Sequence, residues 1–178
     1  MKKITTVIII AVLATAGYFG YDYAMDKSIT NNSAWSETGN SEFTVKLPES
    51  MKSSSNLFYT SDGQEQIAFY ENSKVDFSVV KIPYSVNENL KNIDVKSYLE
   101  NLKINGNSID AKAVNGGYYY AISRELKGYF QDTKKVFEID GMFKGENAFY
   151  NVEIHCRERD RNDYENYMIE WLESFKLK

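Results

Sequence analysis

The chain contains one histidine and one cysteine, and they are adjacent, at His155 and Cys156. An imidazole and a thiolate can ligate zinc together or act as base and nucleophile, but both functions require the two side chains to converge. Residues 148–157 alternate like a half-buried strand, whose neighbouring side chains point to opposite faces. We therefore expect Cys156 to be a buried, unreactive thiol and His155 to lie at the surface or the rim of the domain.

No other motif of catalysis or cofactor binding stands out in the sequence. It has no glycine-rich phosphate loop, no Gly-x-Ser-x-Gly elbow, no calcium-binding loop and too few histidines and cysteines for a usual zinc site. Carboxylates are plentiful, but the sequence alone does not separate a catalytic pair from surface charge. We predict no catalytic, cofactor-binding or metal-binding residue and favour a non-enzymatic role.

Three of the four arginines lie close together, at Arg157, Arg159 and Arg161, and alternate with acidic residues. The simplest interpretation of such alternating charges is a solvated loop ahead of the last helix. The functional interpretation is an ion-pairing patch for an acidic partner. The three arginines are therefore candidate partner-binding residues.

Three consecutive tyrosines, Tyr118 to Tyr120, follow a pair of glycines. On a strand, Tyr119 points away from the other two, so that one ring is expected to be exposed. Exposed tyrosines are frequent in protein contacts, which makes Tyr119 the fourth candidate partner-binding residue. The alternative is that the rings pack under a helix on one face and against neighbouring strands on the other.

An uncharged, mostly apolar run of 18 residues extends from Ile4 to Tyr21. As a helix it would be about 27 Å long, close to the thickness of about 30 Å of a bilayer core. Lys2 and Lys3 precede it, which favours a cytoplasmic N-terminus. We expect an uncleaved transmembrane anchor over residues 4–21. The alternatives are a signal peptide cleaved at the small residues 14–16 and an ordinary buried helix.

The remaining composition predicts one globular domain on a tether. We assign residues 1–25 to the signal anchor, 26–40 to a flexible polar tether and 41–178 to an extracytoplasmic α+β domain. Two of the 21 Lys and Arg residues and none of the 25 acidic residues lie in 1–21, which leaves a net charge of −6 for the rest. We expect such an acidic domain neither to bind nucleic acid nor to be drawn to anionic lipid.

Hydrophobic periodicity predicts an antiparallel sheet with two helices. Alternation of period two and turn residues indicate strands, and apolar residues at helical spacing indicate helices near 94–102 and 163–175, with Asp94 and Asn162 as N-caps. Glu165 has capping-box spacing from Asn162, and Gly106 is a plausible stop for the first helix. The expected strands are 42–47, 57–60, 64–70, 75–82, 109–114, 118–126, 135–143 and 148–157.

The order of these elements resembles the PsbP-like family, which is named for an extrinsic subunit of photosystem II. The resemblance rests on FTVKLPESM (Phe43–Met51), the central hairpins and the ending FYNVEIHC (149–156) with YENYMIEWLESFK (164–176). It implies an α/β/α sandwich around an antiparallel sheet. It also implies a binding or accessory role more often than catalysis, and it carries no ligand motif.

These observations predict a membrane-tethered, extracytoplasmic binding or accessory domain that contacts another envelope or membrane protein. Two alternatives remain, an envelope enzyme that uses a carboxylate pair and a structural subunit of a membrane complex. If the N-terminal segment is cleaved, the domain is instead secreted or periplasmic.

Overall fold

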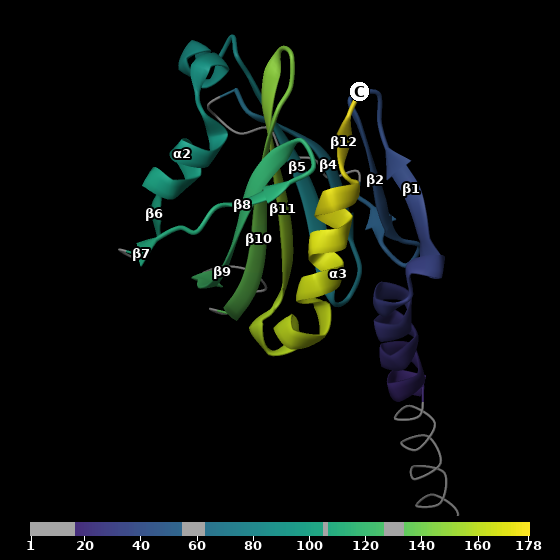
Figure 1. The fold of residues 1–178 in the computed structure, drawn as a ribbon. Helices are drawn as coiled ribbons and strands as arrows, with labels where there is room; N and C mark the ends of the chain where they lie inside the picture. The colour runs from purple at the N-terminus through teal and green to yellow at the C-terminus, as the bar shows by residue number, and fades with distance from the viewer. Residues whose placement is uncertain (1–16, 55–62, 105–106, 127–133) are drawn as a thin grey trace, which may run out of the picture.

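A central antiparallel sheet of seven strands organises the chain, in the order β3-β4-β5-β11-β10-β9-β8 (Figure 1). This computed structural model describes residues 17–54, 63–104, 107–126 and 134–178. Two smaller sheets accompany the central one, β1-β2-β12 and β6-β7. The predicted α+β class with an antiparallel sheet and few helices is confirmed.

The described elements have the following bounds. The strands are β1 Trp35–Gly39, β2 Phe43–Pro48, β3 Lys52–Ser53, β4 Glu65–Glu71, β5 Val75–Pro83, β6 Lys103–Ile104, β7 Asn107–Ser108, β8 Lys112–Val114, β9 Gly117–Leu126, β10 Lys134–Lys144, β11 Ala148–Arg157 and β12 Lys176–Leu177. The helices are η1 Asn32–Ala34, η2 Glu88–Asn92, α2 Val95–Asn101, η4 Glu158–Asp160 and α3 Arg161–Ser174, and residues 17–30 are also helical.

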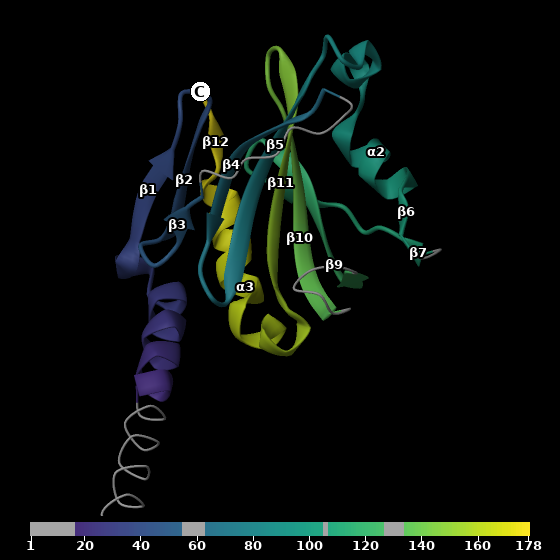
Figure 2. The same cartoon turned by 180° about the vertical axis from the view of Figure 1, so that it is seen from behind.

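Both faces of the central sheet are covered. One face packs with α3 and β2 in the larger core, where Phe143 and Phe43 both contact the ring of Phe175. The opposite face packs with α2 and η2 in a second cluster that includes Leu99 and Phe149. Figures 1 and 2 show α3 and α2 on opposite sides of the sheet, which is the layered arrangement that the sequence predicts.

The caps and boundaries predicted for the two main helices are observed only in part. Asp94 caps α2, and its carboxylate accepts a hydrogen bond of 2.7 Å from the amide of Ser97. The last helix begins two residues earlier than predicted, at Arg161. The expected capping box is absent at this start: Glu165 pairs with Arg161 instead, at 2.9 Å. The predicted strand 57–60 and the helix stop at Gly106 lie outside the described residues.

Residues 26–40 are not the flexible tether that their polar composition predicts. Residues up to 30 are helical, η1 follows, and β1 pairs along its whole length with β2. Trp35 supplies the packing that holds this segment, because its ring lies 5.8 Å from that of Trp171 on α3. Polar residues suit this edge strand because only one of its sides meets the core, so composition alone was misleading here.

The helix of residues 17–30 is fastened to the domain at its C-terminal end. Ile29 is completely buried in the main core, and its carbonyl accepts a hydrogen bond from the indole of Trp35 at 3.0 Å. Asp26 accepts a hydrogen bond from the hydroxyl of Tyr164 on α3. The helix therefore projects from the domain as a docked element, seen in purple in Figure 1.

Most of the predicted anchor, Ile4 to Tyr21, falls on residues 1–16, outside the described part of the chain. Within the described residues, no helix combines the length and the apolarity that crossing a bilayer requires. The anchor therefore stays a prediction.

Candidate functional site: the cavity at one end of the central sheet

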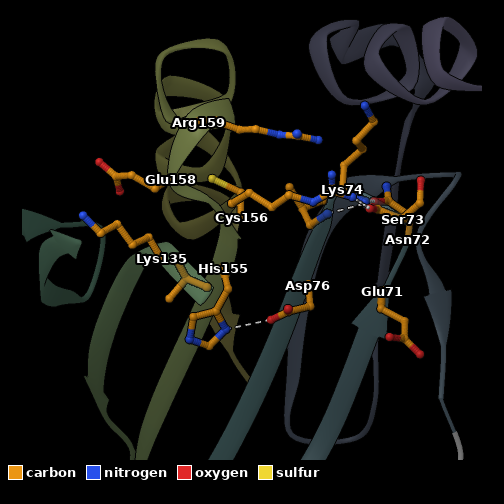
Figure 3. A pocket seen from close by; sticks show the side chains of 13 residues that line it. Glu71, Asn72, Ser73, Lys74, Asp76, Lys135, His155, Cys156, Glu158 and Arg159 are labelled. Atoms are coloured by element: carbon orange, nitrogen blue, oxygen red, sulfur yellow. Dashed lines mark hydrogen bonds and ion pairs between the residues drawn. The ribbon is translucent and has the colours of Figure 1, made fainter. Parts of the chain in front are cut away.

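A cavity of about 870 Å³ lies where β5 begins and β11 ends. The turn before β5, the start of β10 and the passage from β11 into η4 form its walls (Figure 3). Its lining is charged at the rim and contains the small apolar side chains of Val75, Val136 and Cys156 within. Charged side chains thus surround an apolar interior, an arrangement typical of ligand-binding pockets.

The β4–β5 turn gives the cavity its first wall. The side-chain oxygen of Asn72 accepts hydrogen bonds from the amides of Lys74, at 2.8 Å, and Val75, at 3.0 Å, and so fixes the turn. The Lys74 ammonium lies 2.5 Å from the carboxylate of Asp22 and 3.5 Å from that of Asp26. Burial alone would lower the pKa of Lys74, but these two carboxylates raise it. The turn is therefore tied to the helix of residues 17–30.

His155 sits between two carboxylates on neighbouring strands. It stands opposite Asp76 of β5 and Glu138 of β10, and its ring nitrogens lie 2.7 Å and 2.9 Å from their oxygens. Arg124 of β9 also pairs with Glu138. Burial alone would lower the pKa of His155, but the hydrogen bonds to both carboxylates raise it to about 10. The imidazole is therefore protonated at neutral pH.

The prediction that His155 lies at the surface or the rim is wrong, because its exposed fraction is only 8%. The sheet is packed on both faces, so His155 is buried on the polar face of β11, where Asn151 and Glu153 are partly buried and Arg157 is exposed. Cys156 points to the other face and is buried, as predicted. Burial raises the pKa of its thiol to about 12, which makes it a poor nucleophile at neutral pH.

A second buried carboxylate belongs to the same polar face, away from the cavity. The hydroxyl of Tyr120 donates a hydrogen bond of 2.5 Å to one oxygen of Asp140. The other oxygen is buried and has no hydrogen-bond partner among the described residues. Burial raises the pKa of Asp140 to about 7, although the bond from Tyr120 acts against the rise. Burial likewise raises the pKa of Glu153 on β11, and nearby Glu138 adds to the rise.

The structure brings together only two of the four candidate partner-binding residues. Arg157 and Arg159 are exposed and line the cavity, where the guanidinium of Arg157 donates to the carbonyl of Ser73 at 3.2 Å. Arg161 lies outside the lining, with its guanidinium carbon 4.4 Å from the centre of the Phe137 ring.

The ring of Tyr119 is not exposed: only 7% of the residue is accessible, and it belongs to the core cluster that includes α3. Tyr120 is buried in the cluster on the opposite face. The alternative interpretation, in which the tyrosine rings pack on both faces of the sheet, is therefore correct. A buried ring cannot contact a partner without a rearrangement of the core.

The chemistry available at the cavity is recognition by charge. A histidine held as a cation by two carboxylates is not a general base at neutral pH, and the Cys156 thiol is protonated. Among the described residues, no group of three or more His, Cys, Asp or Glu side chains is placed to hold a metal ion. Lys135, Arg157 and Arg159, in contrast, present exposed cationic ends at the rim.

Sequence reasoning missed Lys74, Asp76 and Glu138 as members of the site. A signal was present for Glu138 and Asp140, which recur at every second position of an otherwise apolar strand and so share one face. The link from Lys74 to Asp22 joins segments 52 positions apart and leaves no local pattern.

Comparison with known proteins identifies the fold. No family model matches the chain, and no curated protein matches it. The solution structure of cyanobacterial PsbP (CyanoP) from Synechocystis sp. PCC 6803 is similar, with a TM-score of 0.52 and 9% identity over 84% of this chain and 95% of that chain. The predicted resemblance to the PsbP-like fold is confirmed, and at this identity the likeness shows the fold alone.

Two further solved structures are similar at lower TM-scores, which are too low to support an argument. The Ran-binding protein Mog1p of Saccharomyces cerevisiae gives 0.47, with 11% identity over 80% of this chain and 95% of that chain. LpqN, involved in cell envelope biogenesis of Mycobacterium tuberculosis, gives 0.39, with 10% identity over 81% of this chain and 91% of that chain.

Proposed function

We propose that this chain is a membrane-tethered, extracytoplasmic binding domain with an accessory role, held at the bilayer surface beside another envelope protein. Four exposed aromatic side chains on the helix of residues 17–30 carry the proposal: Tyr18, Phe19, Tyr21 and Tyr23 are 52% to 68% exposed. In the described part of the chain, the only other exposed large hydrophobic residue is Val86.

The placement of these rings suits the headgroup region of a membrane. At about 100° per residue, Phe19 and Tyr21 point in directions about 160° apart, so no single flat protein surface would cover both. Tyrosine favours the boundary between the apolar core and water, and the uncharged run from Ile4 leads directly into this belt. Lys2 and Lys3 favour a cytoplasmic N-terminus, which would place the domain on the far side.

Binding fits the site better than catalysis does. The cavity offers exposed arginines and a lysine at its rim, whereas its histidine and its cysteine are both held in protonated forms at neutral pH. Such a site recognises charge without an evident group to transfer protons or form covalent bonds.

The anchor is tested by fractionating cells that express the full-length chain. We expect the protein to stay with the membrane after an alkaline carbonate wash, to keep the mass of residues 1–178, and to be digested by protease added to the extracytoplasmic side. A soluble protein that lacks residues 1–16 would instead establish the cleaved, secreted form. Protection from the protease would contradict the proposed orientation.

The envelope partner is tested by crosslinking the full-length chain in cells and identifying the captured proteins. The control replaces residues 1–21 by an unrelated transmembrane anchor. Capture of the same envelope protein by both forms is the expected result, because the domain makes the contact. Loss of capture in the control would favour a structural subunit that assembles through its membrane helix.

A further inference from the structure

The exposed rings of Tyr18, Phe19, Tyr21 and Tyr23 form an aromatic belt on the helix of residues 17–30. The cavity lies at the same level as this belt along the helix axis. The ion pair of 2.5 Å between Lys74 and Asp22 fixes this relation, because Asp22 stands between the exposed rings of Tyr21 and Tyr23. Lys74 belongs to the turn that forms one wall of the cavity. In Figures 1 and 2, the start of α3, which follows η4, lies at the same end of the molecule as the N-terminal part of this helix.

We propose that the cavity holds the headgroup of an anionic phospholipid from the leaflet that faces the domain. The inference rests on the proposed function, since a domain without a membrane anchor would not be held at this height. Tyrosine rings mark headgroup depth. A cavity tied to residues of that belt therefore lies at the depth of the lipid phosphates.

The rim has exposed cationic side chains that can pair with the phosphate of such a headgroup. Two lining cations are already neutralised, Lys74 by Asp22 and Asp26, and His155 by Asp76 and Glu138. Lys135, Arg157 and Arg159 are exposed in the lining together with the carboxylates of Glu71 and Glu158, and Asp160 lies 3.4 Å from Arg159, so the rim carries charges of both signs.

The geometry of the rim also suits a phosphate. In Figure 3, the Arg159 side chain extends toward Lys74. Arg157, the last residue of β11, also lines the cavity. A guanidinium binds a phosphate through two parallel N–H donors, so each of the two exposed arginines offers such a pair of donors to an anionic group.

Hydrogen–deuterium exchange on the full-length chain in lipid nanodiscs tests the proposal. One set of discs contains phosphatidylcholine alone, and the other contains phosphatidylcholine mixed with phosphatidylglycerol. We expect exchange at residues 71–76 and 157–159 to slow several-fold in the second set. The double variant Arg157→Gln with Arg159→Gln should lose this slowing. The matched control, Lys103→Gln with Lys112→Gln, removes two exposed lysines elsewhere and should keep it.

The same experiment tests the membrane anchor and the lipid site separately. Protection of residues 17–23 in both kinds of disc reports that the chain is anchored. Anchoring with no effect of phosphatidylglycerol at the cavity overturns the lipid site and leaves the proposed function standing. No protection of residues 17–23 overturns the proposed function itself. Glycerophosphoglycerol or inorganic phosphate, added to phosphatidylcholine discs, should have no effect at the cavity. If either reproduces the slowing, the ligand is a soluble phosphate and the lipid proposal is wrong.

Discussion

Lys74 and Asp22 form an ion pair of 2.5 Å that joins a turn of the central sheet to the helix of residues 17–30. The Lys74 side chain is only 8% exposed, while that of Asp22 is 36% exposed. The pair is therefore partly protected from solvent, and its loss should be felt locally. It also fixes the position of the cavity along the helix of residues 17–30, next to the exposed rings of Tyr21 and Tyr23.

Substitution of Lys74 by glutamine should loosen this docked helix. We expect a loss of about 1 kcal/mol in the free energy of unfolding, because half-exposed pairs are screened by solvent. The larger effect should be faster hydrogen exchange at residues 22–28, measured on the full-length chain in detergent. Lys27→Gln is the matched control, since Lys27 is exposed on the same helix. Equal exchange in the two variants would show that the ion pair does not hold the helix.

The buried imidazole of His155 should make the protein less stable in alkaline solution. Its pKa is raised from 6.5 to about 10 by the bonds to Asp76 and Glu138, so its contribution is complete below pH 6.5 and is lost as the pH rises toward 10. Between pH 7 and pH 9 we expect a loss of about 2–3 kcal/mol, at about 1.4 kcal/mol per pH unit. Urea unfolding of the full-length chain in detergent at several pH values measures it.

The variant His155→Gln supplies the control for that slope. It is expected to be less stable than the natural chain at pH 7, because Asp76 and Glu138 lose their cationic partner. Its stability should nevertheless change little between pH 7 and pH 9. A slope that is the same in both proteins would place the titrating group elsewhere.

Asp140 should produce a separate dependence at lower pH. Burial raises its pKa from 3.8 to about 7, so the protonated form is favoured in the fold and stability is lost as the pH rises toward 7. In the variant Asp140→Asn, the amide has nearly the shape of the protonated carboxyl group and does not titrate. Relative to the natural chain, the variant should therefore gain about 2–3 kcal/mol between pH 5 and pH 7, measured by urea unfolding.

Tyr120→Phe separates the carboxyl group of Asp140 from its hydrogen bond. This variant removes the donor that lowers the pKa of Asp140 and leaves the carboxyl in place. It should keep the loss of stability with rising pH that Asp140→Asn abolishes. A constant difference between Asp140→Asn and the natural chain at all pH values would contradict a raised pKa.

Local patterns in the sequence predicted most of the fold. Alternation along 135–143 and 148–157 identified β10 and β11, and Asp94 marked the start of α2. Each of these patterns lies in the same short segment of sequence as the strand or helix that it predicts. Burial of Cys156 followed from the same alternation, because an apolar face of a strand turns toward the core.

The errors have a common physical cause, which is contact between segments distant in the sequence. Residues 26–40 have the composition of a linker, but Trp35 of β1 packs against Trp171, more than a hundred positions away, while β1 pairs with the neighbouring β2. Alternation along a strand does not show whether its polar face is covered, so it places His155 at the surface or the rim and leaves an exposed Tyr119 ring as one of two interpretations. The second packed face, with α2 above it, has no local signature in the strands themselves.

The central claim, that the cavity end of the domain lies at the membrane surface, is tested most directly by depth measurement. Spin labels would be attached at Ser73→Cys, in the cavity wall, and at Glu146→Cys, in the turn at the opposite end of β11, in the full-length chain reconstituted in lipid. The ten residues of β11 span about 30 Å and separate the two positions. We expect the label at position 73 to lie at headgroup depth, shielded from aqueous relaxation agents, and the label at 146 to lie in water. Equal exposure of both labels to water would contradict the claim.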